Sequence, residues 1–361
     1  MENERPAVWK PQVWVLAGAH AGDTAQAIAL ADALGWPYEI KQLQFNSFYR
    51  IPNILLQASL RTLSPSARAA LSGSVPDLVI AVGRRTAPVA RAIRARAPGR
   101  VRLVHIGRPR APLDWFDLVV TTPQYGLPER ANVLHNPVPL TADPAAVAPE
   151  VLDRWRSTFA HLPRPWIAVL AGGSRAPYLF DAEAARALGR RASALATSRG
   201  GSLLVTTSPR TGQEAANALA DSLTAPAYTY LWHPGGDNPY KAILRLADRF
   251  VVTGESVSMI TEACRSGKPV QVFDVPRDGR TISAEGSFGS MRGRLTAWGI
   301  LPGIRDVETF TGRLIRDGLI GPLEVVDFEP RAPMPDPMPN TVDRVRALFQ
   351  VESSRCGSKT P

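Results

Sequence analysis

The stretch from Val251 to Pro276, VVTGESVSMITEACRSGKPVQVFDVP, has the pattern of a strand, a turn, a short helix and a second strand. Val251 and Val252 are apolar and β-branched, which suits a strand that is buried on both faces. Gly267 and Pro269 fit the end of the helix. This order of elements is typical of the α/β crossovers that build a parallel sheet.

The turn that follows this first strand is a candidate phosphate-binding site. Its small residues expose backbone N–H groups at the start of a helix, where the helix dipole favours an anion. Ser256 or Ser258 can cap that helix. Glu262, within the same helix, can accept both hydroxyls of a ribose. The alternative is an ordinary crossover whose Ser, Thr and Glu side chains face water.

Length and composition favour a soluble protein of two domains. The chain has 361 residues and 45% hydrophobic residues, and no apolar run approaches the roughly 20 residues of a membrane helix. The charged N-terminus lacks an apolar signal core, so we expect no secretion. Cys264 and Cys356 show neither metal spacing nor a disulfide framework, which fits a reducing compartment. We therefore expect a cytoplasmic protein.

The formal net charge is +10, and nine arginines without an acidic residue lie between Arg84 and Arg110. Such a stretch can meet nucleic acid, anionic lipid or a phosphorylated ligand, or it can be a solvated helix face. We expect no nucleic-acid partner, because the sequence has no helix-turn-helix, zinc-finger or RNP-like pattern. We predict contact with an anionic membrane surface, which would place the protein on the cytoplasmic face of the inner membrane.

The first half of the chain alternates strands and helices. Val13–Leu16 is predicted to be a strand, and a glycine-containing turn precedes a helix over Thr24–Leu34. Asp77–Val82 is a further buried strand. The glycine spacing is not GxGxxG, so we predict no dinucleotide fingerprint.

The second half repeats this order from Trp166 onwards, after a Pro- and Ala-rich linker at 137–150. The predicted fold class is α/β, with two Rossmann-like domains whose parallel sheets face each other across a cleft. We expect an N-terminal domain over 1–140, a C-terminal domain over 141–325, and an extension over 326–361 with a short helix and a disordered tail.

Ligands of open parallel sheets bind at the carboxyl ends of the strands, and the turns of the second half lie at such ends. Glycines leave backbone donors accessible there, and arginine forks suit phosphate. Together these turns suit a nucleotide diphosphate. The candidate donor-nucleotide residues are Gly172, Gly173, Ser174, Arg175, Ser208, Arg210, Thr211, Thr253, Gly254, Glu255, Ser256, Ser258, Met259 and Glu262.

The first domain offers His20 and Asp23 as candidate catalytic bases, which would remove a proton from an acceptor hydroxyl. Asp23 can instead cap the helix that follows, and His20 can be an exposed turn residue. Arg84 and Arg85 are candidates for holding an anionic acceptor. The five histidines are scattered without ligand spacing, and no P-loop is present, so we expect no metal and no cofactor.

Several motifs resemble the elongated-mitochondria family of plant fission factors and bacterial proteins. They include GAHAGDTAQAIALADAL, VGRRTAPVARAIR, RPRAPLDWFDLVVTTPQYGLPERANVL, LAGGSRAPY, TTSPRTG and HPGGDNPYKAILRLADRFVVTGESVSMITEAC, and they span roughly 13–276. The resemblance implies a GT-B architecture in which the C-terminal domain holds the donor nucleotide and Glu262 binds its ribose. The opening turn, Ala17-Gly18-Ala19-His20-Ala21-Gly22, departs from the bacterial pattern Asp-Gly-Lys-Pro-Gly-His. The resemblance therefore does not by itself assign the role of catalytic base to His20.

The resemblance and the turns together predict a glycosyltransferase that uses a nucleotide-diphosphate sugar, with a lipid-linked or envelope glycan as acceptor. One alternative is a sugar-nucleotide epimerase of the same architecture. The other is a non-catalytic adaptor, since plant members of the family are described as recruiting a dynamin-related protein to mitochondria. The sequence does not indicate an oligomeric state.

Overall fold

The computed structural model describes residues 10–18, 21–142, 147–278, 306–325 and 327–350. These residues form two compact units. The first unit holds the described residues through Ala142 together with those from Asp336 onwards, and the second unit holds the described residues between them.

The first unit is built on a six-stranded parallel sheet with the order β2-β1-β3-β4-β5-β6. Because β1 and β3 consist entirely of buried apolar residues, they lie inside the sheet, and the largely exposed β2 lies at its edge. The strands are β1 (Val13–Ala17), β2 (Tyr38–Gln42), β3 (Leu78–Val82), β4 (Arg102–Ile106), β5 (Leu118–Thr121) and β6 (Val133–His135).

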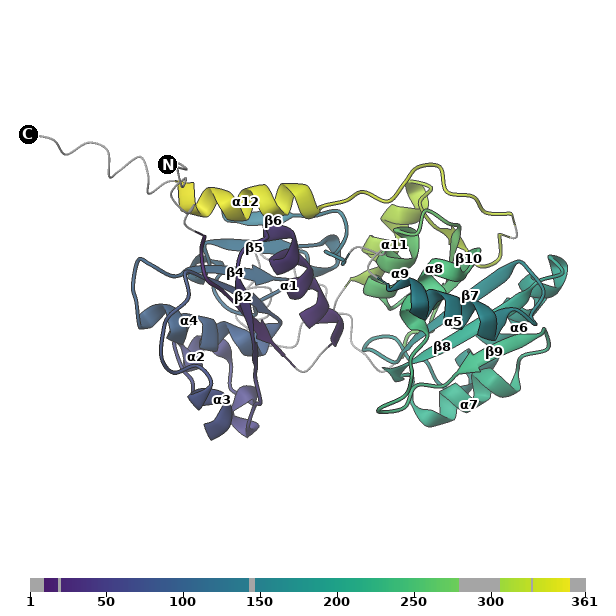
Figure 1. Cartoon of the computed structure of the whole chain (residues 1–361), viewed down its shortest axis with the longest axis horizontal. Helices are drawn as coiled ribbons and strands as arrows, with labels where there is room; N and C mark the ends of the chain where they lie inside the picture. The colour runs from purple at the N-terminus through teal and green to yellow at the C-terminus, as the bar shows by residue number, and fades with distance from the viewer. Residues whose placement is uncertain (1–9, 19–20, 143–146, 279–305, 326, 351–361) are drawn as a thin grey trace, which may run out of the picture. The chain divides into compact units, whose positions relative to one another are not determined.

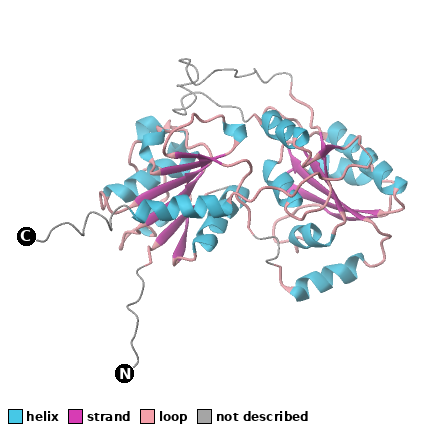
Figure 2. Ribbon diagram, turned by 90° about the horizontal axis from the view of Figure 1, so that it is seen from above, coloured by secondary structure: helices cyan, strands magenta, loops and turns pink. Residues whose placement is uncertain are grey.

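Alternate residues of these strands feed two apolar cores, one on each face of the sheet. Leu16 and Val79 pack with α4 (Ala87–Ala95) on one face, and Val15 and Ile80 pack with α1 (Ala21–Leu34) on the other. Figure 2 shows helices on both faces of each sheet. The helical segments are α1 (Ala21–Leu34), η1 (Ser47–Arg50), α2 (Asn53–Leu56), α3 (Pro65–Ala69), η2 (Arg84–Thr86), α4 (Ala87–Ala95), η3 (Leu113–Trp115), η4 (Pro123–Tyr125) and α12 (Met338–Gln350).

The last helix, α12, is part of the first unit, although the sequence places it in a separate extension. Val342 and Val345 are buried in the core that α1 also lines, and Nδ2 of Asn136 donates a hydrogen bond of 3.0 Å to Oγ1 of Thr341. Figure 1 shows α12 beside α1 and β6. The chain therefore returns to its first unit after completing the second.

The second unit has its own six-stranded parallel sheet, with the order β12-β11-β10-β7-β8-β9. Its strands are β7 (Trp166–Gly173), β8 (Ser202–Arg210), β9 (Ala227–Tyr230), β10 (Arg249–Thr253), β11 (Val270–Phe273) and β12 (Gly321–Pro322). Its helices are α5 (Pro149–Phe159), α6 (Ala182–Ser198), α7 (Gln213–Asp221), α8 (Tyr240–Leu246), α9 (Val257–Cys264) and α11 (Val307–Arg316). The prediction of two Rossmann-like α/β domains with parallel sheets is confirmed.

Three local expectations differ from the structure. Strands β7 and β8 continue through residues that the sequence assigns to turns, because Gly173 pairs with Arg210 after an irregularity in the ladder. Helix α1 begins at Ala21, so Asp23 lies in its first turn rather than at its cap. Ser256 is the N-cap residue of α9, but its side chain makes no capping hydrogen bond.

None of the helices in the described part of the chain is long and apolar enough to cross a bilayer.

Candidate functional site

The carboxyl ends of β10, β7 and β8 lie side by side in the second unit and form the candidate site. Gly172 and Gly173 end β7, and both positions need glycine. A Cβ on Gly173 would overlap the backbone carbonyl of Arg210, and φ is +106° there. A Cβ on Gly172 would overlap Oε1 of Glu255 and lie 2.8 Å from Cβ of Ser256. The glycines thus let the ends of three strands approach one another closely.

Several groups that were predicted to bind a phosphate form hydrogen bonds within the protein instead. The backbone N–H of Gly172 donates a hydrogen bond of 2.8 Å to Oγ1 of Thr253. Oγ of Ser174 accepts one of 2.9 Å from the backbone N–H of Phe180. The backbone N–H of Gly254 donates to the carbonyl of Phe273 at 2.9 Å. Because these bonds are already made, Gly172, Ser174 and Gly254 shape the site rather than offer these groups to a ligand.

Ser208 and Thr211 have a similar role at the carboxyl end of β8. The backbone N–H of Ser208 donates to Oγ1 of Thr211 at 2.9 Å, and that hydroxyl donates to the carbonyl of Ala171 at 3.2 Å. Oγ of Ser208 donates to the carbonyl of Gly172. These bonds hold the end of β8 against the end of β7, so that the side chain of Arg210 extends from a fixed position.

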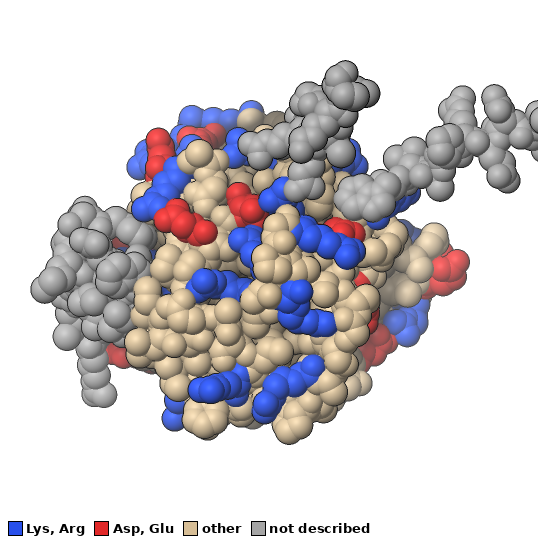
Figure 3. Space-filling view, turned by 90° about the vertical axis from the view of Figure 1, so that its left-hand side faces the viewer, with Lys and Arg blue, Asp and Glu red and all other residues tan. Residues whose placement is uncertain are grey.

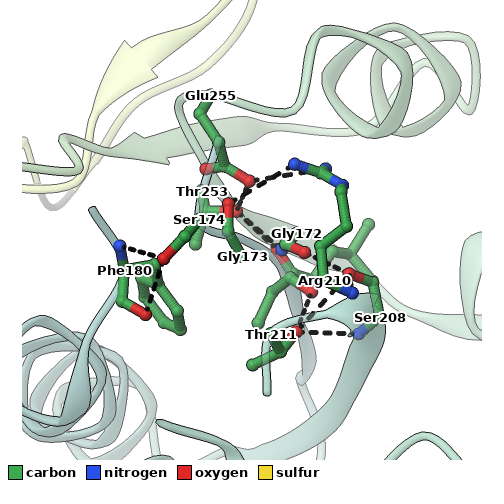
Figure 4. Close-up of polar contacts among 11 residues, drawn as sticks. Gly172, Gly173, Ser174, Phe180, Ser208, Arg210, Thr211, Thr253 and Glu255 are labelled. Atoms are coloured by element: carbon green, nitrogen blue, oxygen red, sulfur yellow. Dashed lines mark hydrogen bonds and ion pairs between the residues drawn. The ribbon is translucent and has the colours of Figure 1, made fainter. Parts of the chain in front are cut away.

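Arg210 and Glu255 form the charged centre of the site (Figure 4). Nη2 of Arg210 lies 3.7 Å from Oε1 of Glu255, and Oγ1 of Thr253 donates a hydrogen bond of 3.3 Å to the same oxygen. Glu255 is only 3% exposed. Burial raises the pKa of its carboxyl to about 7, against the opposing effect of Arg210. Arg175 is close enough for its charge to act on the same carboxyl.

Helix α9 begins at Val257, two residues after Glu255, and carries the remaining candidates. Its first backbone N–H groups have no partner within the helix, as at any helix N-terminus. Ser258 and Met259 are partly exposed in its first turn. Glu262, farther along, is partly buried and accepts a hydrogen bond from the hydroxyl of Tyr240. Burial raises the pKa of both side chains.

Tyr240 was missed by the sequence analysis. It lies at the start of α8, 22 residues before Glu262, and no spacing rule links the two positions. The only available signal was its place at the end of the turn-forming run His-Pro-Gly-Gly-Asp-Asn-Pro. In the structure the hydroxyl of Tyr240 donates to one oxygen of the Glu262 carboxylate and so fixes the orientation of that carboxylate.

The first unit has a second polar cluster at the ends of β1, β3 and β4. Oδ2 of Asp23 lies 3.8 Å from the position that a Cβ on Gly83 would take. His105 of β4 is fully buried, and its Nε2 lies 3.2 Å from the carbonyl of Gly83. Burial lowers the pKa of His105 to about 4, while the nearby charge of Asp23 acts in the opposite direction. His20 lies outside the described residues.

Arg84 and Arg85 follow β3 and contact the η1 segment. Nη2 of Arg84 donates a hydrogen bond of 2.6 Å to the carbonyl of Tyr49, and the guanidinium of Arg85 lies 3.8 Å from the centre of the Tyr49 ring. Burial lowers the pKa of Arg84. Arg108, after β4, is more strongly affected, since burial and the charge of Arg110 lower its pKa to about 10.

Metal binding and catalysis by a cysteine nucleophile have little support among the described residues. No three His, Cys, Asp or Glu side chains in the described ranges are grouped closely enough to hold a metal ion. Cys264 is buried in α9, and burial raises the pKa of its thiol. A buried thiol with a raised pKa is a poor nucleophile.

The family model for mitochondrial fission ELM1 matches residues 21–296, which is most of the chain and includes both polar clusters. The chain belongs to the mitochondrial fission ELM1 family. The family resemblance found in the sequence motifs is therefore confirmed.

Two relatives extend this ELM1 assignment. The chain is 31% identical over 243 residues to the mitochondrial fission protein ELM1 of Arabidopsis thaliana, and the match covers 60% of this chain and 56% of the plant protein. It is 25% identical over 306 residues to the uncharacterized protein RP120 of Rickettsia prowazekii, covering 73% of this chain and 83% of that protein. The match thus spans little more than half the length of the plant relative.

Two solved structures share the fold of this ELM1-family chain. The UDP-GlcNAc 2-epimerase of Neisseria meningitidis, bound to UDP-GlcNAc, has a TM-score of 0.52 at 12% identity, and the alignment covers 94% of this chain and 99% of that one. The S. aureus MnaA–UDP co-structure has a TM-score of 0.50 at 12% identity, covering 94% and 96%. At this identity the similarity establishes a common architecture.

Proposed function

We propose that the second unit binds a nucleotide-diphosphate sugar and that the protein transfers the sugar to an acceptor bound by the first unit. The acceptor class that we propose is an anionic glycan, lipid-linked or part of the envelope. The observation that carries the proposal is the convergence of three strand ends on Arg210, Glu255 and the N-terminus of α9.

The diphosphate belongs at this convergence. The guanidinium of Arg210 extends from the end of β8, which internal hydrogen bonds hold in place, and Arg175 lies near the carboxyl of Glu255. The first N–H groups of α9 add the positive end of a helix dipole. Glu255 opposes an anion when it is ionised, but its raised pKa leaves a large fraction of the carboxyl protonated near neutral pH. The site is therefore basic enough for a diphosphate.

The ribose belongs on Glu262. Glu262 comes six positions after Ser256, which corresponds to roughly 9 Å along the axis of α9. A nucleoside diphosphate can bridge that length from its ribose hydroxyls to its phosphates. Tyr240 donates to Oε2 of Glu262, so Oε1 remains to accept from a ribose hydroxyl. The UDP and UDP-GlcNAc in the two solved structures of this fold make UDP-sugars the first donors to test.

The second substrate is assigned to the first unit. Asp23 is our candidate base, because it lies at the ends of the parallel strands beside Gly83. Arg84 and Arg85 follow the same strand end and suit an anionic acceptor. His105 is a poor alternative base, since it is fully buried. His20 stays a candidate on the sequence alone.

An epimerase is the second candidate, favoured by the two solved structures named above. The two reactions differ in their requirement for a second substrate, because an epimerase converts the nucleotide sugar without an acceptor. A non-catalytic adaptor would show neither reaction.

The experiment incubates purified protein with UDP-, GDP-, ADP- and CMP-sugars, with and without a lipid extract as acceptor. A transferase releases nucleotide only when the acceptor is present, and an epimerase yields a new nucleotide sugar in its absence.

The Asp23→Asn variant should lower transfer by about 100- to 10,000-fold and leave nucleotide affinity unchanged. Asp32→Asn, an exposed carboxylate on the same helix, is the matched control. Normal transfer by Asp23→Asn would exclude Asp23 as the base.

A further inference from the structure

The segment formed by η1, α2 and the following loop displays apolar side chains to solvent. The exposed fractions are 56% for Phe48, 36% for Ile51 and 72% for Leu55. Together with Leu56, Ser59 and Arg61, these side chains line a groove of about 240 Å³. We call the surface formed by Phe48, Ile51 and Leu55 the apolar face.

Buried polar contacts hold this segment in place. The fully buried Asn53 donates from Nδ2 to the carbonyls of Arg84 at 2.8 Å and Pro109 at 3.0 Å. Asn46 donates to the carbonyl of Arg61 at 2.8 Å. The backbone is thus fastened to the loops after β3 and β4, while the apolar side chains point away from the core. A fixed backbone with exposed apolar side chains is typical of a contact surface.

The charge around the apolar face has one sign. Between Ile40 and Leu113 the chain has thirteen basic residues and a single acidic one, Asp77. Asp77 is buried and bound to Arg100 at 3.0 Å, so it contributes little negative charge to the surface. Figure 3 shows the side of the molecule on which α2, α3 and α4 lie in Figure 1, and the lower central part of that view holds basic side chains and no acidic ones.

Several of the nine arginines between Arg84 and Arg110 have partners inside the first unit. Arg94 bonds to Asp117, Arg96 bonds to the carbonyls of Leu71 and Gly73, and Arg100 bonds to Asp77. Other arginines lie close to the apolar face. Arg50 and Arg61 are exposed within the segment itself, and Nη1 of Arg91 donates to Oε1 of Gln57 at 2.7 Å. The basic side chains beside the apolar face therefore come from the segment itself and from the stretch between Arg84 and Arg110.

We propose that the apolar face and its arginines dock the protein on the surface of an anionic bilayer. Phe48, Ile51 and Leu55 would enter the interface between headgroups and acyl chains, where their apolar area leaves water. The surrounding guanidiniums would bind lipid phosphates. An apolar centre with a basic rim matches such a bilayer in both polarity and charge.

The test is flotation of the full chain with phosphatidylcholine vesicles, with and without phosphatidylglycerol. Wild-type protein should float with the anionic vesicles at low salt and bind more weakly at high salt, because salt screens the arginines but not the apolar contact. The Phe48→Ser/Leu55→Ser variant should bind at least about tenfold more weakly. Arg50→Gln/Arg61→Gln should lose most of the preference for anionic lipid.

Matched controls come from the second unit. Ile315→Ser and Arg316→Gln replace an exposed apolar and an exposed basic side chain on α11, and both variants should float like wild type. Melting curves establish that each variant is folded. Equal flotation of Phe48→Ser/Leu55→Ser and wild type would overturn the proposal, as would failure of wild type to bind anionic vesicles. Loss of a dimer in that variant, without any vesicle binding by wild type, would identify a second copy of the chain as the occupant.

Discussion

Nη2 of Arg210 lies 3.7 Å from Oε1 of Glu255, and the two residues come from strand ends on either side of β7. The carboxyl is buried, so its pKa is raised to about 7 even though a guanidinium faces it. The charge of this site therefore changes within the physiological pH range. Any anion that binds Arg210 competes with the ionised form of Glu255.

This competition predicts a pH-dependent affinity for nucleotide sugars. The pKa of Glu255 is raised above its ordinary value of 4.5, so the folded protein holds a proton there up to about pH 7. Below that pH, Arg210 is available to the diphosphate. Affinity should fall by up to about tenfold per pH unit as the pH rises above about 7. The diphosphate of a nucleotide sugar does not itself titrate in this range, so calorimetry at several pH values isolates the protein group.

The Glu255→Gln variant should bind the same nucleotide sugar with nearly constant affinity across that pH range. Glu214→Gln, an exposed glutamate in the first turn of α7, should retain the wild-type pH profile. An unchanged pH slope in Glu255→Gln would assign the titration to another group.

Two glycine substitutions should have opposite effects on stability, because Gly173 lies where β7 and β8 approach closely and Gly312 lies in a helix with free space around it. Gly173→Ala places a Cβ against the backbone of Arg210 at a φ of +106°, and the cost should be about 1–3 kcal/mol or more. Gly312→Ala lies in α11 with no atom within 4 Å of the added carbon, and it should stabilise by about 0.5–1 kcal/mol.

Thermal unfolding measures both glycine effects. Gly173→Ala should lower the melting temperature and weaken nucleotide binding, because the displaced backbone carries Arg210. Gly312→Ala should raise the melting temperature and leave binding unchanged. Wild-type behaviour of Gly173→Ala would mean that β7 and β8 do not meet as described.

His105 predicts a loss of stability in mild acid. Burial lowers its pKa from 6.5 to about 4, so between these values the unfolded chain binds a proton that the folded protein does not. The stabilisation is full above about pH 6.5 and is lost as the pH falls toward 4, by up to about 3 kcal/mol. His105→Gln should flatten this part of the stability profile. The exposed His161→Gln should not, and equal slopes in both variants would contradict the assignment.

Much of the fold was predictable from the sequence because several of its inner strands are buried on both faces. The run LVIAV is apolar throughout and RFVVT has an apolar centre, and the alternation of such runs with helices indicates parallel sheets. The strands predicted over Val13–Leu16 and Asp77–Val82 agree with β1 and β3 to within one residue at each end. The ends of β7 and β8 were predicted to be turns, because glycine ordinarily marks a turn, whereas here it permits two backbones to approach closely.

The candidate site was only partly predictable. The turns at the ends of β7, β8 and β10 were identified because the sheet topology brings strand ends together. Which of their hydrogen-bonding groups face inward was not, since Thr253 reaches Gly172 across 81 residues. The Tyr240–Glu262 bond and the cluster of Asp23, Gly83 and His105 depend on the same kind of long-range packing.

Calorimetric titration of a nucleotide sugar shows whether Glu262 holds the ribose of the bound nucleotide, on which the proposed function depends. Loss of a hydrogen bond to a charged group costs on the order of 1.5–3 kcal/mol, so Glu262→Ala should bind about tenfold or more weakly than wild type. Tyr240→Phe should show a smaller loss, because it only frees the carboxylate, and Glu214→Ala should bind like wild type. Equal affinity of a folded Glu262→Ala variant and wild type would contradict the account.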